Sequence, residues 1–385
     1  MLEKALKGSE RYWGWLAVLS FFIAIGFGAY LYQYFQGLGV TGMSRDVSWG
    51  IYISQLTYLV GVAASGVMLV LPYYLHNYKE FGKITILGEF MAVAAVFTCM
   101  MFVLVDLGQP SRLLNLFLYP TPNSILFWDA IVLNVYMLLN IVVGWTVLQS
   151  ERKSMPPPKW VKPLIYLSIP WAFSIHTVTA FLYSGLAGRH FWLTAIMAPR
   201  FLASAFCAGP AILLLIVFIL RRLTGFDPGQ KAIRALAKII TYAMITNLFF
   251  LSLELFTAFY SNIPGHKHTF IYLFAGLEGH YALVPVMWAS VLLGIFSLIL
   301  LIPPRFRNNE KILIIALMAL VLSTWLEKGM GLVVAGFIPN MLDHVTEYYP
   351  SVYELAITVG IYSLGIFILT VLFKIALEVK KEAAS

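Results

Sequence analysis

The chain has 385 residues, of which 60% are hydrophobic and only 11% are charged. A soluble domain carries about 25% charged residues, so this composition excludes a soluble enzyme, a disordered chain and a disulfide scaffold. The formal net charge of +8 does not indicate nucleic-acid binding, because basic residues in so apolar a chain usually report membrane topology. The sequence therefore predicts an all-α integral membrane protein in a lipid bilayer.

Ten apolar stretches are long enough to cross a bilayer, which takes about 20 residues per helix. We expect each stretch to be helical, because an open strand leaves its backbone groups unsatisfied in lipid. The ten ranges are 12–35, 49–75, 84–106, 124–148, 161–184, 199–221, 235–262, 273–302, 311–337 and 353–377. Together they indicate a single polytopic domain over 1–385, without room for a soluble domain.

The distribution of Lys and Arg predicts the orientation of the chain. Of the 26 basic residues, 20 fall in the N-terminus, the even-numbered loops or the C-terminus, and five fall in the odd-numbered loops. Because cytoplasmic loops carry the excess of Lys and Arg, both termini are predicted to be cytoplasmic. The expected location is the cytoplasmic (inner) membrane, with a multi-pass topology.

Nine ionisable side chains are predicted to lie within the hydrocarbon of the membrane, where such groups are costly and usually functional. They are Glu89, Asp106, Asp129, His176, Glu254, Glu278, His280, Glu327 and Lys328. At about 1.5 Å of rise per residue, all except Glu89 lie in the outer half of the membrane. This asymmetry predicts a polar site beneath the outer face, lined by at least five helices. The alternative is a set of scattered ion pairs, such as Asp106 with Arg112 or Glu254 with Lys328.

A buried carboxylate near a histidine can exchange protons near neutral pH. Such groups suit quinol oxidation or quinone reduction, because each two-electron step moves two protons. The two cysteines, Cys99 and Cys207, are isolated in apolar runs and cannot hold an iron–sulfur cluster. His176 is the one histidine predicted well inside the membrane, whereas a b-type haem usually needs two facing histidines. We therefore expect no haem, no iron–sulfur cluster and no metal site in this chain.

Several motifs resemble the NrfD/polysulfide reductase membrane-subunit family, also described as PsrC-like. The segment Asp106-Leu-Gly-Gln-Pro-Ser-Arg112, followed by Pro122-Asn-Ser-Ile-Leu-Phe-Trp-Asp129, is similar to the signature loop of that family. Ser174–Ala180, Ala198–Phe201 and Glu327–Gly329 look like its ten-helix branch, which includes the DsrP and HmcC types. These motifs span nearly the whole chain, and they resemble the DsrP type more closely than the HmcC type.

The resemblance implies two inverted four-helix bundles, with helices two to five (about 49–184) in the first. Helices six to nine (about 199–337) form the second, and helices one and ten are peripheral. It also implies a menaquinone site near the outer face, beside a ferredoxin-like iron–sulfur partner subunit. Electrons would pass between the quinone and that partner, with coupled proton transfer. A multihaem cytochrome c and further membrane subunits are the other implied partners, in a complex of sulfur or sulfate metabolism.

The candidate site residues come from the motifs and from the depth of the buried charges. The resemblance indicates Asp106, Gln109, Arg112, Asp129 and His176, and the depth argument adds Glu254, Glu278, Glu327 and Lys328. We expect catalytic roles for Asp106, Asp129, His176 and Glu254. The remaining five residues are expected to bind the quinone.

Two other functions share part of this pattern. A proton-coupled transporter also uses buried carboxylates and broken helices, but its site lies near the membrane midplane with access from both sides. A passive membrane anchor for an electron-transfer partner has no need of eight ionisable groups in one half of the membrane. The crowding of polar groups in the outer half therefore favours a quinone-reactive subunit.

Overall fold

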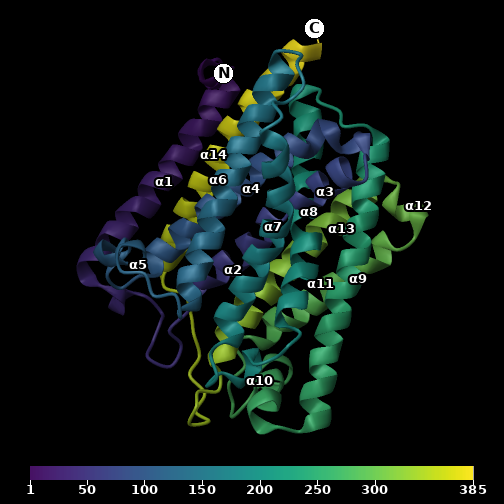
Figure 1. Cartoon of the computed structure of the whole chain (residues 1–385). Coiled ribbons are helices and arrows are strands. Elements are labelled where there is room, and N and C mark those ends of the chain that lie inside the picture. Colours follow the sequence, from purple (N-terminus) through teal and green to yellow (C-terminus); the bar gives the residue numbers. More distant parts are fainter. Residues whose placement is uncertain (385) are drawn as a thin grey trace.

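The computed structural model describes residues 1–384 as helices joined by turns and loops. Within those residues, the one β pairing is an isolated bridge between Leu277 and His280. Both ends of the chain lie at the same end of the helical bundle (Figure 1). We call this the terminal end and the opposite one the far end. The far end corresponds to the predicted outer face.

Ten spans within the described residues are long and apolar enough to cross a membrane, which confirms the predicted all-α, multi-pass membrane protein. The helices that form the spans are α1 (Glu10–Gln36), α2 (Ile51–Ala63) with α3 (Val67–Leu75), α4 (Gly82–Asp106), α6 (Ile125–Arg152), α7 (Val161–Ser184), α8 (Met197–Thr224), α9 (Gln230–Ser261), α11 (Val284–Leu301), α13 (Glu310–Leu326) with η6 and η7, and α14 (Val352–Ala384).

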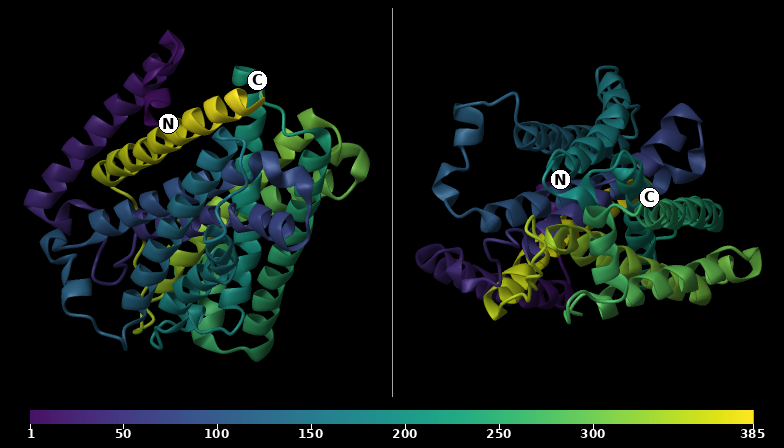
Figure 2. Two further views of the ribbon diagram at one scale, coloured as in Figure 1. Left: turned by 45° about the horizontal axis from the view of Figure 1, so that its top comes forward. Right: turned by 90° about the horizontal axis from the view of Figure 1, so that it is seen from below.

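Short helices connect the spans or extend them. They are η1 (Leu2–Leu6), η2 (Leu38–Val40), η3 (Lys79–Phe81), η4 (Pro110–Arg112), α5 (Asn115–Leu118), η5 (His190–Trp192), α10 (Pro264–Phe274), α12 (Pro304–Arg307), the π-helix η6 (Glu327–Val334) and η7 (Ala335–Phe337). The loop that carries α5 stands away from the bundle, on the side of α1 (Figure 2).

The helices pack as two groups with a peripheral pair. The first group contains α2, α3, α4, α6 and α7, and the second contains α8, α9, α11 and α13. Contacts of α2 with α8 and η6, and of α7 with α8, join the groups. In the most apolar part of each span, 78% of the α2–α3 and α4 residues are buried, against 17% in α1 and 28% in α14. The division into two four-helix bundles with helices one and ten outside stays a prediction.

The second predicted helix, 49–75, is interrupted rather than continuous. α2 ends at Ala63 and α3 begins at Val67, with a short turn between them. The turn packs closely on α8, since a Cβ added to Gly209 would lie 2.9 Å from the carbonyl oxygen of Val62. Irregular backbone is tolerated at this depth because protein, and not lipid, surrounds it.

The eighth predicted helix, 273–302, begins later than expected, because α10 is separate and α11 starts only at Val284. Gly276 and Gly279 both have φ of +85° and turn the chain between α10 and α11. Glu278 lies in this turn, is exposed, and has φ of +51°. The predicted span 273–302, which contains Glu278, was therefore wrong in placing this residue within a helix.

The peripheral helices α1 and α14 meet through two glycines. A Cβ added to Gly26 would lie 2.6 Å from the Cα of Gly360, and one added to Gly360 would lie 2.7 Å from the Cα of Gly26. Small residues at such a crossing let two membrane helices approach closely, so that backbone packing stabilises the pair. The attachment of α1 to the bundle therefore depends on a glycine at both positions.

We expect Gly26→Leu to separate α1 from α14 and to lower the free energy of unfolding by about 1–3 kcal/mol, because overpacking forces a backbone shift. Gly28→Leu is the matched control, since nothing lies within 4 Å of a Cβ at that position in the same helix. Thermal unfolding of both purified variants measures the difference. Equal melting temperatures would contradict the proposed glycine contact.

Candidate functional site

A pocket of about 390 Å³ lies at the far end, between the two helix groups. Its walls come from the segment that leads into α2, the turn after α7, and η7. The lining residues are Ser48, Trp49, Gly185, Leu186, Ala187, Gly188, Arg189 and Phe337. Small-molecule sites usually have volumes of about 300–1,000 Å³, so the pocket is large enough for an organic ligand.

A cluster of aromatic rings holds the pocket in place. The Trp49 ring stacks on Trp192 at 5.8 Å between centroids, and the edges of Tyr183 and Phe337 contact it at 5.6 and 5.7 Å. Trp192 donates its indole N–H to the carbonyl oxygen of Leu332 at 2.9 Å, which ties the cluster to η6. These contacts join α2, α7, η5 and η7, and therefore fix the relative positions of the pocket walls.

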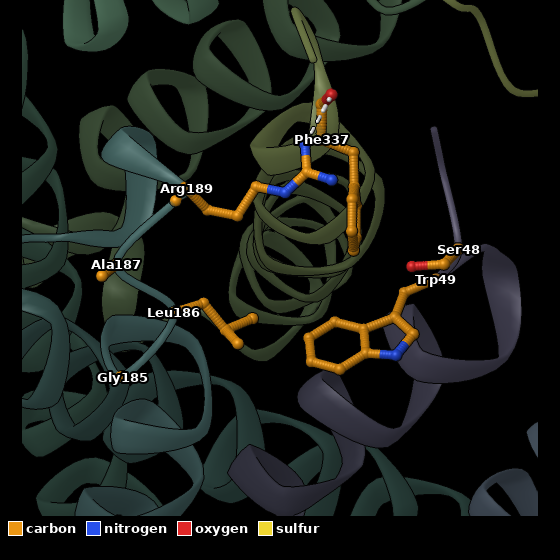
Figure 3. Close-up of a pocket in the computed structure, with 8 residues that line it drawn as sticks. Ser48, Trp49, Gly185, Leu186, Ala187, Arg189 and Phe337 are labelled. Atoms are coloured by element: carbon orange, nitrogen blue, oxygen red, sulfur yellow. Dashed lines mark hydrogen bonds between the residues drawn. The ribbon is translucent and has the colours of Figure 1, made fainter. Parts of the chain in front are cut away.

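Arg189 supplies the positive charge of the pocket. Its guanidinium carbon lies 4.5 Å from the centre of the Phe337 ring, and its Nη1 donates to the Phe337 carbonyl oxygen at 3.2 Å. Burial lowers the pKa of Arg189, and the nearby Asp46 carboxylate partly offsets this effect. Arg189, Phe337 and Trp49 face a common hollow (Figure 3). Two aromatic faces beside a guanidinium suit a planar molecule with hydrogen-bond acceptors at its edge.

A stripe of polar side chains on α7 leads from the pocket into the protein. Tyr183, Thr179 and His176 are spaced by four and three residues, so they lie on the same face of the helix. All three are fully buried. Tyr183 contacts Trp49 at the pocket, and its hydroxyl pairs with that of Thr57 on α2. We call the three residues the α7 stripe.

Asp129 of α6 joins the α7 stripe at its middle. The Thr179 hydroxyl donates to the Asp129 carboxylate at 2.6 Å. Asp129 is 3% exposed, and its charge interacts with the Tyr183 hydroxyl group. The carboxylate is thus positioned beneath the pocket, where a proton could pass between it and the α7 stripe.

His176 forms the inner end of the α7 stripe. Neither ring nitrogen has a hydrogen-bond partner within residues 1–384, although the side chain is fully buried. Buried polar groups nearly always find a partner in protein or ordered water, so His176 has capacity for a further hydrogen bond.

A buried ion cluster lies between α8, α9 and η6. Arg200 forms ion pairs with both Glu254 and Glu327. Asn247 donates to the second carboxylate oxygen of Glu327 at 3.2 Å. The three charged side chains are 4–7% exposed, so each ion relies on its partners rather than on water.

Lys328 is the fourth charged side chain in this region, and its contacts are with Phe201. Its Nζ lies 4.3 Å from the centre of the Phe201 ring and 3.5 Å from the Phe201 carbonyl oxygen. Glu327 and Lys328 are adjacent in the chain but contact different partners. With both carboxylates ionised, Arg200, Lys328, Glu254 and Glu327 have no net charge.

The structure distributes the predicted site residues over several places rather than one pocket. Asp129 and His176 lie along the α7 stripe, whereas Glu254, Glu327 and Lys328 belong to the ion cluster. The suggested pair of Glu254 with Lys328 does not form, because Glu254 pairs with Arg200 instead.

The remaining predicted residues lie at the far end outside the pocket. Asp106 ends α4, and its Oδ1 has no hydrogen-bond partner in the described part of the chain. Gln109, Arg112 and Glu278 are exposed, and Arg112 is the last residue of η4. Asp106 therefore does not pair with Arg112 as one alternative suggested. The roles assigned to these four residues stay predictions.

Two arginines of the site were not singled out from the sequence. Arg189 belongs to a loop, and Arg200 lies at the start of the sixth predicted span, 199–221. α8 begins at Met197, so Arg200 lies within its first turn and is buried. The sequence did contain a signal that Arg200 lies at the start of a helix: the preceding residue is Pro199, and proline is frequent at the first positions of a helix.

The described side chains offer hydrogen bonds, charge and aromatic faces. Among residues 1–384, no three His, Cys, Asp or Glu side chains gather closely enough to hold a metal ion. Cys99 and Cys207 are both buried and free. The pocket, the α7 stripe and Asp129 together can bind an organic molecule and exchange protons with it.

Known proteins resemble the chain over most of its length. A Halobacterium salinarum protein, named as a candidate membrane subunit of dimethyl sulfoxide reductase, is 26% identical over 92% of this chain and 89% of its own. The integral membrane subunit of an Hdr-like menaquinol oxidoreductase from Archaeoglobus fulgidus is 26% identical over 65% of this chain and 62% of its own. The integral membrane subunit of a menaquinone reductase from Nitratidesulfovibrio vulgaris is 21% identical over 95% of this chain and 91% of its own.

The model of the family described as "Polysulphide reductase, NrfD" matches residues 39–338. This range contains eight of the ten spans, including both helix groups, together with the far-end pocket, the α7 stripe and the ion cluster. The match also agrees with the resemblance carried by the loop after the third span and by the motif in the fifth. The chain belongs to the NrfD/polysulfide reductase family of membrane subunits.

Proposed function

We propose that this chain is the menaquinone- or menaquinol-interacting membrane subunit of a respiratory electron-transfer complex. The observation that carries the proposal is the far-end pocket, in which Arg189 and two aromatic rings lie directly above the α7 stripe and Asp129. The names of the Archaeoglobus and Nitratidesulfovibrio relatives, which refer to menaquinol and menaquinone, support the same ligand.

Each part of the pocket has a task in this proposal. Trp49 packs against the quinone ring, Phe337 borders that ring nearly at a right angle to Trp49, and Arg189 donates hydrogen bonds to one of the quinone oxygens. The guanidinium also stabilises negative charge that builds on that oxygen during reduction. The position of the pocket at the far end keeps the quinone ring near a partner that binds outside the membrane.

Protons follow a different direction from electrons. Oxidation of a quinol releases two electrons and two protons, and Asp129 is the carboxylate best placed to accept a proton through the α7 stripe. His176, whose ring nitrogens have no hydrogen-bond partner among residues 1–384, provides a second group further inside. Transfer onward to Lys328 and the ion cluster would couple the reaction to proton movement within the membrane.

The electron partner is proposed to be a ferredoxin-like iron–sulfur subunit docked on the far end. Exposed Gln109, Arg112 and Glu278 lie in the loops that such a subunit would cover, with Asp106 beneath them. A complex of sulfur or sulfate metabolism, of the DsrP or HmcC type and with a multihaem cytochrome c and further membrane subunits, is the finer proposal. Its location would be the cytoplasmic membrane with both termini inside.

Arg189→Gln is expected to lower kcat/KM for a menaquinol analogue by about ten- to a hundredfold. The reason is that a hydrogen bond from a charged donor contributes about 1.5–3 kcal/mol. Turnover by the purified complex measures the effect. Arg45→Gln is the matched control, because Arg45 is an exposed far-end arginine that does not line the pocket. An equal loss in both variants would indicate a general effect of surface charge and would contradict the pocket assignment.

Asp129→Asn is expected to reduce kcat by about a hundredfold or more, with KM little changed, since a positioned proton acceptor contributes that much to catalysis. Steady-state turnover with the same analogue checks this, alongside a test of complex assembly. Thr146→Val on the same helix is the control, because its hydroxyl bonds only to its own helix at Val142. Unchanged turnover in Asp129→Asn would exclude Asp129 as the proton acceptor.

A second candidate is a proton-coupled transporter, and the break between α2 and α3 is the observation that favours it. The far-end position of the pocket favours the quinone reaction instead. Reconstituted chain in liposomes with an internal pH-sensitive dye distinguishes the two. We expect no proton-driven solute uptake by the chain without quinone. Uptake in that assay would support the transporter, whereas a passive anchor would show neither uptake nor quinone turnover.

A further inference from the structure

The chain continues past the family match, which ends at residue 338, into a segment 339–354 that contains the start of α14. In this segment Ser351 and Glu354 form a capping box. The Ser351 hydroxyl accepts from the Glu354 N–H at 3.2 Å, and the Glu354 carboxylate accepts from the Ser351 N–H at 2.8 Å. This reciprocal pair explains the start of α14, but it accounts for only one of the hydrogen bonds that the carboxylate accepts.

The Glu354 carboxylate accepts two further hydrogen bonds from other parts of the chain. The Gly42 N–H, in the loop before α2, donates to one carboxylate oxygen at 2.6 Å. The Tyr348 hydroxyl donates to the other oxygen, also at 2.6 Å. Glu354 is fully buried, so these donors replace the water that an exposed carboxylate would bind. Helix capping requires neither contact, and both therefore point to a second role for Glu354.

Tyr348 connects Glu354 with the start of α2. Its hydroxyl accepts from the N–H of Ile51, the first residue of α2, at 2.8 Å. The first N–H groups of a helix have no partner within the helix, and Gly50, which precedes α2, has no side chain that could cap them. The Tyr348 ring also lies against Gly50, since an added Cβ there would be 2.5 Å from the Tyr348 hydroxyl oxygen. Tyr348 therefore fixes the backbone on which α2 begins.

Trp49 directly precedes this fixed backbone and forms one wall of the far-end pocket (Figure 3). A second contact holds the chain on the other side of Trp49, because the Thr346 hydroxyl donates to the Asp46 carboxylate at 3.0 Å. Neither Thr346 nor Tyr348 lines the pocket. The segment 339–354 therefore holds the backbone of Trp49 from outside the pocket.

We propose that Glu354, acting through Tyr348, is a positioning residue for quinone binding in the far-end pocket. The carboxylate orients the Tyr348 hydroxyl, which holds the start of α2 and so keeps the Trp49 ring in place to pack against the quinone. A loosened Trp49 ring would have to be ordered whenever a quinone binds, and that entropy cost weakens binding. The inference rests on the proposed function, because it assumes that the far-end pocket binds the quinone.

The first test is Tyr348→Phe, which removes the hydroxyl and keeps the ring and the capping box. We expect KM for a menaquinol analogue to rise by about three- to tenfold, as for the loss of one hydrogen bond. The value of kcat should not change, because the reacting groups stay in place. Steady-state turnover by the purified complex measures both quantities.

Tyr362→Phe is the matched control. The Tyr362 hydroxyl is also part of a contact with α2, but it donates to the Oε1 of Gln55 at 2.6 Å instead of capping the start of the helix. Both variants are expected to lower the melting temperature, because each loses a hydrogen bond to α2. Only Tyr348→Phe should raise KM.

Variants of Glu354 and Trp49 test how the effect arises. Glu354→Ala should raise KM at least as much as Tyr348→Phe. Glu354→Gln keeps a hydrogen-bonding group beside the Tyr348 hydroxyl and should raise KM less. Trp49→Ala should raise KM by itself, and adding Tyr348→Phe to that variant should have no further effect. Such non-additivity is expected when one residue acts through another.

The outcomes separate this inference from the proposed function. A KM rise in Tyr348→Phe that is absent in Tyr362→Phe and on the Trp49→Ala background supports the inference. An equal rise in both tyrosine variants, or an additive effect with Trp49→Ala, would show a general structural role and overturn it. An unchanged KM in Tyr348→Phe beside a raised KM in Trp49→Ala would also overturn it and leave the proposed function standing. An unchanged KM in Trp49→Ala would contradict the far-end quinone site, and this inference with it.

Discussion

The ion pairs of Arg200 with Glu254 and Glu327 are the constraint on which much of the interior depends. A charge among membrane spans is stable only when nearby groups compensate it, so these side chains must remain together. Their pairing holds α8, α9 and η6 in one arrangement. Lys328, the neighbour of Glu327, contacts the Phe201 ring instead of a carboxylate.

The π-helix η6 makes this arrangement possible. A π-helix changes the direction of successive side chains relative to an α-helix and often occurs at functional sites. Glu327 and Lys328 begin η6 and reach different partners, while the carbonyl oxygen of Leu332 accepts the indole N–H of Trp192. Because Trp192 stacks on Trp49, the same element connects the ion cluster with the far-end pocket.

Two kinds of site meet along α7. At its far end, rigid aromatic rings and Arg189 form a pocket with little capacity for proton exchange. Below it, Tyr183, Thr179 and His176 give a row of groups that can donate and accept protons, with Asp129 at the side. This division suits a molecule whose electrons and protons leave in different directions. It also explains why the buried acids are concentrated near one end of the membrane.

The sequence alone was sufficient for the class of protein, for the number of spans and for most of their bounds, because lipid demands long apolar helices wherever the chain crosses it. It also indicated Asp129 and His176, since polar groups in apolar stretches are visible without a structure. It did not reveal the break after Ala63 or the late start of α11, which depend on local packing and on glycines with positive φ.

What only the tertiary structure decided is which charges meet. Glu254 was assigned to Lys328 as one alternative, but Arg200 lies nearer once α8 begins at Met197. Arg189, Trp49 and Phe337 are far apart in the sequence and form a pocket only when the ends of α2, α7 and η7 converge. The depth of a residue follows from its place along a helix. Its partners follow from the rotation and packing of that helix against others, which hydropathy does not record.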